Sequence, residues 1–118
     1  ATLVRKPLLR ADGSLWNAEI DIGGSTIMLA APDPAAPMTQ TAFVYVQVED
    51  ADATFQRAIE AGATAMMAPQ DQFYGDRDGG VQDLSGNIWW ISTHKDDLSD
   101  DEIERGARAL EAQKAGEA

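Results

Sequence analysis

A four-residue motif occurs twice in this chain and divides it into two related halves. Asp-Ile-Gly-Gly at positions 21–24 corresponds to Asp-Leu-Ser-Gly at positions 83–86. An apolar strand is expected after each copy, Thr26 to Leu29 in the first half and Ile88 to Ile91 in the second. Self-similarity of this kind indicates that one supersecondary unit is used twice.

The first half is predicted to consist of strands. Residues 3–9 are expected to form a strand that leads into a turn at 11–14. From residue 16 to 22 the chain alternates, as a half-buried strand does. Glycines 23 and 24 then turn the chain into a second strand, Ser25 to Ala30. The alternation places the polar residues, Glu19 among them, on one face of this strand. The apolar residues lie on the other face: Trp16, Ala18, Ile20 and Ile22.

The second half is predicted to follow the order strand, helix, strand, strand, strand. Its strands are expected at 43–48, 64–68, 80–84 and 87–93. Asp50 can accept the first free amides of a helix, and Gly62 is placed to end that helix in a left-handed conformation. Pro69 is expected to stop the strand before it, which leaves residues 70–80 as a loop.

These elements divide the chain into one main domain and a tail. Residues 1–98 contain a partial first module at 1–31, a proline-rich linker at 32–40 and a second module at 41–98. Residues 99–118 form the tail, which opens on a Ser-Asp-Asp-Glu capping box. The apolar stripe of this tail is thin, so we expect a helix that docks weakly on the domain or on a partner.

Composition excludes several classes of function. The 118 residues contain no cysteine and a single histidine, which leaves no disulfide and no conventional zinc cluster. Twenty acidic and nine basic residues give a net charge of −11, which disfavours nucleic acid as a partner. No apolar run approaches the ~20 residues of a membrane span, and the start of the chain shows no signal-peptide pattern. We therefore expect a cytoplasmic protein with no membrane partner.

Five runs of the sequence, in their order and spacing, are typical of one family: Trp16–Gly23, Val46–Ala53, Phe73–Arg77, Asp83–Trp89 and Thr93–Leu98. On these runs the chain resembles the vicinal oxygen chelate superfamily, and within it the PhnB-like branch. That superfamily contains glyoxalase I, the fosfomycin-resistance enzymes, extradiol dioxygenases and the bleomycin-resistance proteins. The resemblance implies an α+β fold of paired βαβββ modules, whose strands form an open, curved mixed sheet around one cavity. It also implies a homodimer, and the leading β-α unit of the first module would lie before Ala1.

The resemblance also locates the positions where metal-using members carry histidine, glutamine or glutamate. Three of them map to Phe43, Trp90 and Met28, and the fourth precedes residue 1. None of these three side chains offers the oxygen or imidazole nitrogen that a divalent metal needs. We therefore expect no metal and no cofactor at this site.

Aromatic surface takes the place of the missing metal ligands. Flat rings suit planar or cationic guests through stacking and cation–π attraction. Adjacent strand residues point to opposite faces, and the resemblance aims Trp90 into the cavity while leaving Trp89 for the helix-covered face. Phe73 and Tyr74 belong to a loop that can cover the mouth of the cavity. The predicted ligand-binding residues are Trp16, Met28, Phe43, Tyr45, Gln47, Phe73, Tyr74 and Trp90.

Candidate catalytic groups are few. His94, the only histidine, follows the last strand and can be either a proton-transfer group or a solvated strand-end residue. Glu19 can be a buried general base or an exposed carboxylate. Asp76 and Arg77 can form an ion pair that fixes their loop.

Three functions fit these observations. The first is metal-free binding of a small aromatic or cationic molecule, as in antibiotic sequestration by the bleomycin-resistance proteins. The second is an enzyme of the lyase or isomerase type that uses a carboxylate or His94, or a metal site completed by residues outside this chain. The third is an interaction protein with a filled, vestigial cavity.

Overall fold

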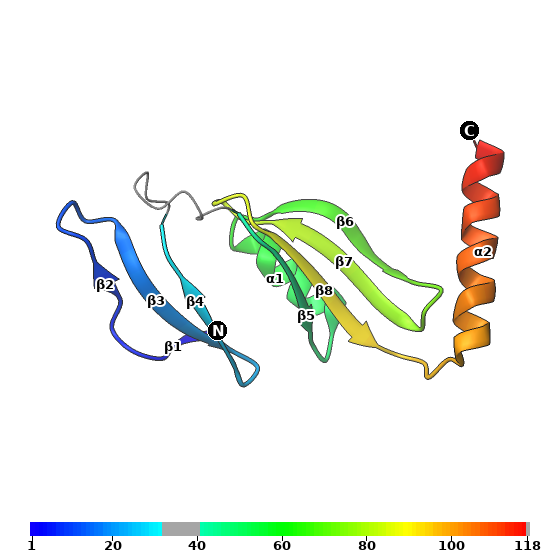
Figure 1. The fold of residues 1–118 in the computed structure, drawn as a ribbon, viewed down its shortest axis with the longest axis horizontal. Coiled ribbons are helices and arrows are strands. Elements are labelled where there is room, and N and C mark those ends of the chain that lie inside the picture. Colours follow the sequence, from blue (N-terminus) through cyan, green and yellow to red (C-terminus); the bar gives the residue numbers. More distant parts are fainter. Residues whose placement is uncertain (32–40, 118) are drawn as a thin grey trace. The chain divides into compact units, whose positions relative to one another are not determined.

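The chain forms two compact units, Ala1–Gln40 and Thr41–Ala118, seen in a computed structural model (Figure 1). The structure describes residues 1–31 and 41–117, and the predicted linker at 32–40 lies outside this part of the chain. Each unit is described by itself. Within the described residues, no helix is long and apolar enough to cross a membrane.

The first unit is a four-stranded antiparallel sheet built around one long strand, β3 (Leu15–Ile22). β4 (Ser25–Leu29) pairs with β3 through a tight turn, as the two glycines predict. The short strands β1 (Thr2–Leu3) and β2 (Leu8–Leu9) pair with the two ends of β3. The single strand predicted over residues 3–9 is therefore wrong. Pro7 lies between the two short strands, and its lack of an amide hydrogen disfavours continuous pairing there.

The second unit has the predicted order of elements. It comprises β5 (Phe43–Gln47), α1 (Ala51–Glu60), β6 (Thr64–Asp71), β7 (Asp76–Gln82), β8 (Ile88–His94) and α2 (Asp100–Glu117). The sheet order is β5-β8-β7-β6. β5 runs parallel to β8, and the other neighbours are antiparallel. The fold class is α+β, as predicted.

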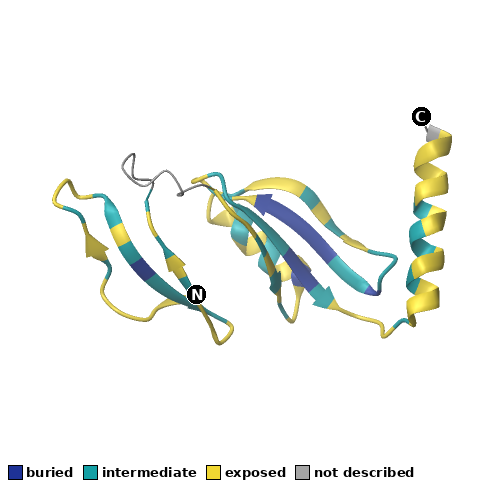
Figure 2. Ribbon diagram, viewed as in Figure 1, coloured by how far each residue is buried: buried dark blue, intermediate teal, exposed yellow. Residues whose placement is uncertain are grey.

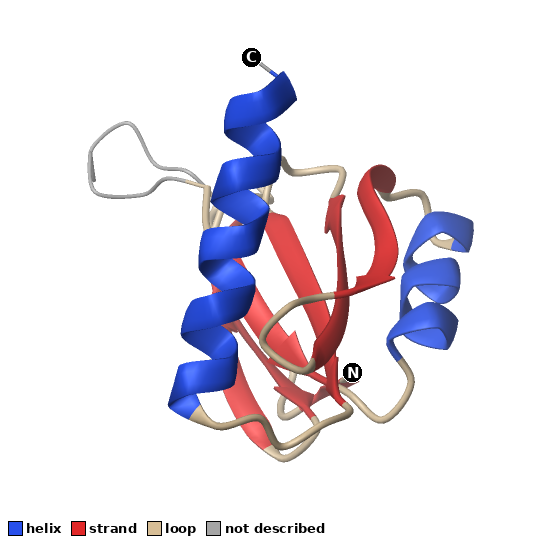
Figure 3. Ribbon diagram, turned by 90° about the vertical axis from the view of Figure 1, so that its right-hand side faces the viewer, coloured by secondary structure: helices blue, strands red, loops and turns tan. Residues whose placement is uncertain are grey.

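The core of the second unit lies between its sheet and α1 (Figures 2 and 3). Ala51 of α1, Val81 of β7 and Ile91 of β8 are buried together, and Phe55 and Trp89 pack against them. β7 is the most buried strand, because it lies inside the sheet and beneath the helix. All of these sheet residues share one face, so the opposite face is left for other contacts.

Local sequence signals set the ends of both helices. The side chain of Asp50 accepts a hydrogen bond from the amide of Ala53 at 3.1 Å and begins α1. Gly62 follows α1 with a positive φ of 109°, as predicted. Ser99 accepts from the amide of Glu102 at 3.2 Å, which is the serine half of the predicted capping box, and its hydroxyl donates to the Glu102 carboxylate at 3.1 Å.

The repeated motif has a direct structural role, because its aspartate binds the following turn. Asp21 accepts a hydrogen bond from the amide of Gly24 at 2.9 Å. Asp83 accepts from the amides of Ser85 and Asn87, both at 2.9 Å. The two turns therefore share one stabilising device, which accounts for the repeat in the sequence.

Two strand boundaries differ from the prediction. β6 continues through Pro69 to Asp71, although its register shifts between Met67 and Gln70. β6 is the edge strand of the sheet, where a proline without an amide hydrogen is tolerated. β7 begins at Asp76, so the predicted loop over 70–80 reduces to a short turn.

Candidate functional site

The face of the second sheet opposite α1 gathers the aromatic and polar side chains that could form a site. In the β5–β8 register Tyr45 lies opposite Trp90, and in the β7–β8 register Gly80 lies opposite Trp90. Residues paired in this way project to the same side of a sheet. We call this side the aromatic face, and it is formed by Phe43, Tyr45 and Gln47 of β5, Asp76, Asp78 and Gly80 of β7, and Trp90, Ser92 and His94 of β8.

The centre of the aromatic face is a stacked ring pair. The rings of Phe43 and Trp90 lie 6.1 Å apart between centroids, with an interplanar angle of 25°. A β-carbon at Gly80 would overlap the six-membered ring of Trp90, so the indole can lie over β7 only because residue 80 is glycine. Phe43 is 62% exposed and Tyr45 is 46% exposed, so this aromatic surface is not part of the core.

Trp89 has the opposite environment. It is paired with Val81 and packs on the α1 side of the sheet. Its indole nitrogen donates a hydrogen bond to the carboxylate of Asp83 at 2.9 Å. Burial disfavours ionisation of Asp83, but the hydrogen bonds from Trp89 and Asn87 outweigh it and lower the pKa of this carboxyl. The two tryptophans thus face opposite sides, as the strand alternation predicts.

Asp78 lies beside the ring pair and is fully buried. Its Oδ2 accepts hydrogen bonds from two phenols, Tyr74 and, at 3.3 Å, Tyr45. Its Oδ1 has no hydrogen-bond partner among the described residues. Burial, followed by the hydrogen bond to Asp78, raises the pKa of the Tyr74 hydroxyl, which therefore stays protonated and donates at neutral pH.

A second polar cluster continues the aromatic face toward the end of β8. Asp76 Oδ2 accepts from the buried hydroxyl of Ser92 at 3.3 Å, and its Oδ1 lies 2.7 Å from His94 Nδ1. His94 Nε2 lies 2.6 Å from Asp97 Oδ1. The hydrogen bonds to Asp97 and Asp76 raise the pKa of His94. The histidine is about half exposed, but it is held between two carboxylates rather than simply solvated.

The turn between β6 and β7 holds Phe73 and Tyr74 in place. The carbonyl of Gly75 accepts hydrogen bonds from the amides of Lys95 at 3.0 Å and Asp96 at 2.9 Å, which ties the turn to the segment after β8. Gly75 has a φ of 94°, and a β-carbon there would overlap the Asp96 carbonyl. Phe73 packs closely against Gly106 of α2 and meets Tyr74 edge to face. Phe73 is therefore engaged with the tail helix, whereas Tyr74 reaches Asp78.

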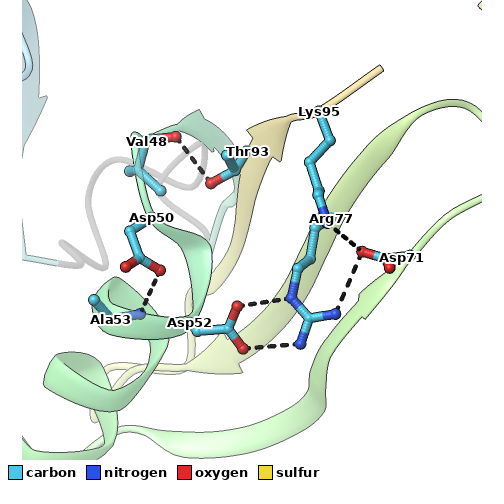
Figure 4. A network of polar contacts seen from close by, with 8 residues as sticks. All are labelled: Val48, Asp50, Asp52, Ala53, Asp71, Arg77, Thr93 and Lys95. Carbon is cyan, nitrogen blue, oxygen red and sulfur yellow. Dashed lines mark hydrogen bonds and ion pairs between the residues drawn. The ribbon is translucent and has the colours of Figure 1, made fainter.

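Arg77 forms a separate network on the α1 side of the sheet (Figure 4). Its guanidinium binds Asp52 of α1 with two contacts, at 2.7 and 2.9 Å, and Asp71 of β6 at 3.4 Å. Lys95 also reaches Asp71, at 3.4 Å. The hydrogen bond from Arg77 lowers the pKa of Asp52. The predicted ion pair between Asp76 and Arg77 is wrong, because these neighbours on a strand point to opposite faces.

The first unit places its predicted site residues on different faces. Met28 pairs with Glu19, whereas Trp16 lies on the opposite face of β3 with Ala18. Trp16 and Met28 therefore cannot both line one cavity on one side of this sheet. The side chain of Glu19 is 17% exposed and forms an ion pair with Arg5 at 3.4 Å.

Comparison with known proteins settles the family. The profile of the Glyoxalase/Bleomycin resistance protein/Dioxygenase superfamily matches residues 2–91. The chain belongs to this superfamily. An uncharacterised protein of Mycobacterium bovis is 38% identical over 103 residues, which cover 79% of this chain and 68% of that protein. An uncharacterised protein of Mycobacterium tuberculosis has the same identity, and the match covers 61% of its length.

Solved structures of other proteins share the fold. TioX from Micromonospora sp. ML1 is 28% identical, with a TM-score of 0.60 over 79% of this chain and 78% of TioX. A glyoxalase/bleomycin resistance protein/dioxygenase from Nocardioides is 18% identical, with a TM-score of 0.54 over 84% of this chain and 70% of that protein. The second likeness concerns the fold alone.

The residues present do not fit the metal that many members of this superfamily use. The mapped positions hold Phe43, Met28 and Trp90, whose side chains offer a hard or borderline cation no oxygen or imidazole nitrogen. Among residues 1–31 and 41–117, no group of three or more histidine, aspartate or glutamate side chains is arranged to hold a metal ion.

Three residues of the aromatic face were not identified from the sequence: Asp78, Gly80 and Ser92. Asp78 falls within a polar stretch that was expected to be a loop, so its burial was not anticipated. The signal that could have found it is the period of two in Asp76, Asp78 and Gly80, which places these residues on one face of a strand.

Proposed function

We propose that this superfamily member binds a small planar aromatic molecule on the aromatic face of its second unit, without a metal. The observation that carries the proposal is the stacked pair of Phe43 and Trp90, in which the ring of Phe43 is exposed. An aromatic surface of this kind stabilises a stacked guest by about 0.5–1.5 kcal/mol per ring pair in addition to the area that it buries.

The construction of the face supports a binding role over a filled core. A core would bury Phe43 and Tyr45, whereas both remain exposed beside the buried Asp78. Gly80 lies beneath Trp90 and gives the indole room to approach the backbone of β7. The ring pair is thus positioned in advance, which lowers the entropic cost of binding a guest.

Several finer points belong to the same proposal. A superfamily named in part for bleomycin resistance supports sequestration of an antibiotic-like compound as the biological role. We further propose that the protein acts in the cytoplasm as a homodimer and belongs to the PhnB-like branch.

The test titrates the protein with a neutral aromatic probe, 2-(1-naphthyl)ethanol. Binding is monitored through the indole N–H resonances of the protein in two-dimensional NMR. The chain has three tryptophans, so Trp90 reports on the aromatic face and Trp89 serves as an internal reference on the other face. We expect saturable shifts of the Trp90 resonance and loss of binding in Trp90→Ala and Phe43→Ala. Leu84→Ala, which removes a highly exposed apolar side chain from a turn, is the matched control. Equal affinity in all three variants, or no saturable shift in the wild type, would overturn the proposal.

A second candidate function is an enzyme of the lyase or isomerase type, with His94 as its proton-transfer group. The specific observation in its favour is the array in which His94 lies between Asp76 and Asp97, with Ser92 bound to the same Asp76. Asp76 fixes the orientation of the imidazole, and the exposed Asp97 would release Nε2 before that nitrogen exchanges a proton with a substrate. Chemical change of a bound compound that is lost in His94→Gln would support the enzyme, and unchanged recovery of the compound would support binding alone.

A further inference from the structure

We propose that Asp78 is the anchor for a cationic group of the ligand, so that the preferred guest is an aromatic ring bearing a protonated amine or a guanidinium. This inference rests on the proposed function and deepens it. It assigns a chemical class to the guest and a role to a residue outside the stacking pair.

One carboxylate oxygen of Asp78, Oδ1, has unmet hydrogen-bonding capacity. Both phenols, Tyr45 and Tyr74, donate to Oδ2, and Oδ1 receives no hydrogen bond from any described residue. A buried carboxylate oxygen without a donor is strongly destabilising, and native structures normally supply a partner. A donor brought by a ligand would meet this requirement.

The ion pairs of the described residues give Asp78 no cationic partner from the protein itself. Arg77, the residue before Asp78, points to the other face and binds Asp52 and Asp71. Lys95 is also paired with Asp71. His94 is engaged with its own two carboxylates, so among the described ion pairs none involves Asp78. A cationic ligand would therefore not compete with an internal partner.

Asp78 also lies within reach of a group attached to a stacked guest. Asp78 and Gly80 lie two residues apart on β7 and face the same side, which separates their Cα atoms by roughly 6–7 Å. Trp90 lies over Gly80. Tyr45 of β5 is the register partner of Trp90, and the hydroxyl of Tyr45 reaches Asp78. Phe43 lies level with Ile88 and Asp78 lies level with Ser92, so the two are on opposite sides of Trp90 along the strands. A ring stacked on the part of Trp90 that lies over Gly80, with a cation on an arm of two or three atoms directed along β7, would reach Asp78. The surrounding ring faces attract a cation as well.

Access to Oδ1 requires one side chain to move, because Asp78 is fully buried. We expect Tyr74 to be the side chain that moves. It lies in the short turn before β7, and its hydroxyl donates a hydrogen bond to Asp78. We expect the amine to enter as the Tyr74 ring swings away from the carboxylate. In that geometry Tyr45 keeps its hydrogen bond to Oδ2, and the ligand occupies Oδ1.

The experiment compares two probes that differ only in charge, 2-(1-naphthyl)ethylamine and 2-(1-naphthyl)ethanol, by NMR titration at pH 7. We expect the wild type to bind the amine at least tenfold more tightly. Asp78→Asn should reduce amine affinity to that of the alcohol and change alcohol affinity less than twofold. Asp71→Asn is the matched control, because it neutralises a carboxylate on the neighbouring strand that lies on the opposite face and is paired with Arg77 and Lys95.

The outcomes separate this inference from the proposed function. If amine and alcohol bind the wild type equally, the anchor is overturned while stacking stands, and this comparison holds even if Asp78→Asn does not fold. If a folded Asp78→Asn retains the preference for the amine, the anchor is assigned to the wrong carboxylate. If neither probe binds, the stacking proposal fails and the anchor fails with it.

Discussion

The indole of Trp90 lies directly over the backbone of Gly80, its partner across the β7–β8 pair. This relationship sets the shape of the aromatic face, because the ring can stack on Phe43 only while nothing projects from residue 80. A glycine inside a buried strand is otherwise unfavourable, so its presence here is explained by the close approach of the ring.

Gly80→Ala should therefore damage the aromatic face more than a methyl group ordinarily would. The new β-carbon would overlap the six-membered ring of Trp90 and displace it from Phe43. We expect at least a fivefold loss of affinity for 2-(1-naphthyl)ethanol and a loss of about 1–3 kcal/mol in the free energy of unfolding. Gly116→Ala, where the same methyl meets no atom within 4 Å, is the control and should leave binding unchanged. Normal affinity in Gly80→Ala would show that the ring position is not needed.

The two adjacent tryptophans should separate binding from stability. Trp89→Ala removes a side chain packed on the core and its hydrogen bond to Asp83, so we expect a loss of about 3 kcal/mol or more on urea unfolding. Trp90→Ala should instead abolish probe binding at a smaller cost in stability. The reverse pattern in paired unfolding and titration experiments would mean that the faces are assigned the wrong way round.

The stability contributed by His94 should depend on pH in a defined direction. Its pKa is raised in the folded protein by Asp97 and Asp76, so the stabilisation is fully present below the unfolded value of 6.5. It is lost as the pH rises through the higher folded pKa. We expect His94→Gln to be less stable than wild type at pH 5.5 and close to wild type at pH 9. A difference in unfolding free energy that does not change with pH would contradict this.

Local signals in the sequence predicted much of the fold. Asp50, Gly62 and the capping box at Ser99 act on their nearest neighbours, so their effects could be anticipated without knowing the rest of the structure. The alternation that separates Trp89 from Trp90 is equally local. These are the elements that the structure reproduces.

The remaining features depend on contacts between distant residues. Pro69 is accepted because β6 is an edge strand, and that position is set by pairing with β7 rather than by nearby residues. Asp78 is buried because β8 and two tyrosines from separate elements surround it. The separation of Trp16 from Met28 follows only from the register of β3 with β4. The part played by each predicted ligand-binding residue stays a prediction until a guest is titrated.

Ligand binding should not depend on a metal. The basis is the side chains at the mapped positions, Phe43, Met28 and Trp90. We expect dialysis against EDTA to leave the affinity for 2-(1-naphthyl)ethanol unchanged, and elemental analysis to find far less than one equivalent of zinc, nickel, manganese or iron. Restoration of binding by one added metal after dialysis would contradict this prediction. It would mean that side chains other than Phe43, Met28 and Trp90 coordinate a metal.

The last prediction concerns assembly, and it arises from the weak core of the first unit. Among residues 1–31, Ala18 is the only buried hydrophobic residue, while Trp16 and Leu3 on the same face of the sheet are largely exposed. A small sheet needs a covered apolar face to be stable in water, and a two-fold dimer supplies one by pairing the same surface of each copy. We therefore expect sedimentation equilibrium at micromolar concentration to report twice the chain mass of 12.7 kDa. Trp16→Glu should shift the protein toward monomer, whereas Leu84→Glu, at an exposed turn of the second unit, should not. A well-folded, strictly monomeric wild type would exclude this arrangement.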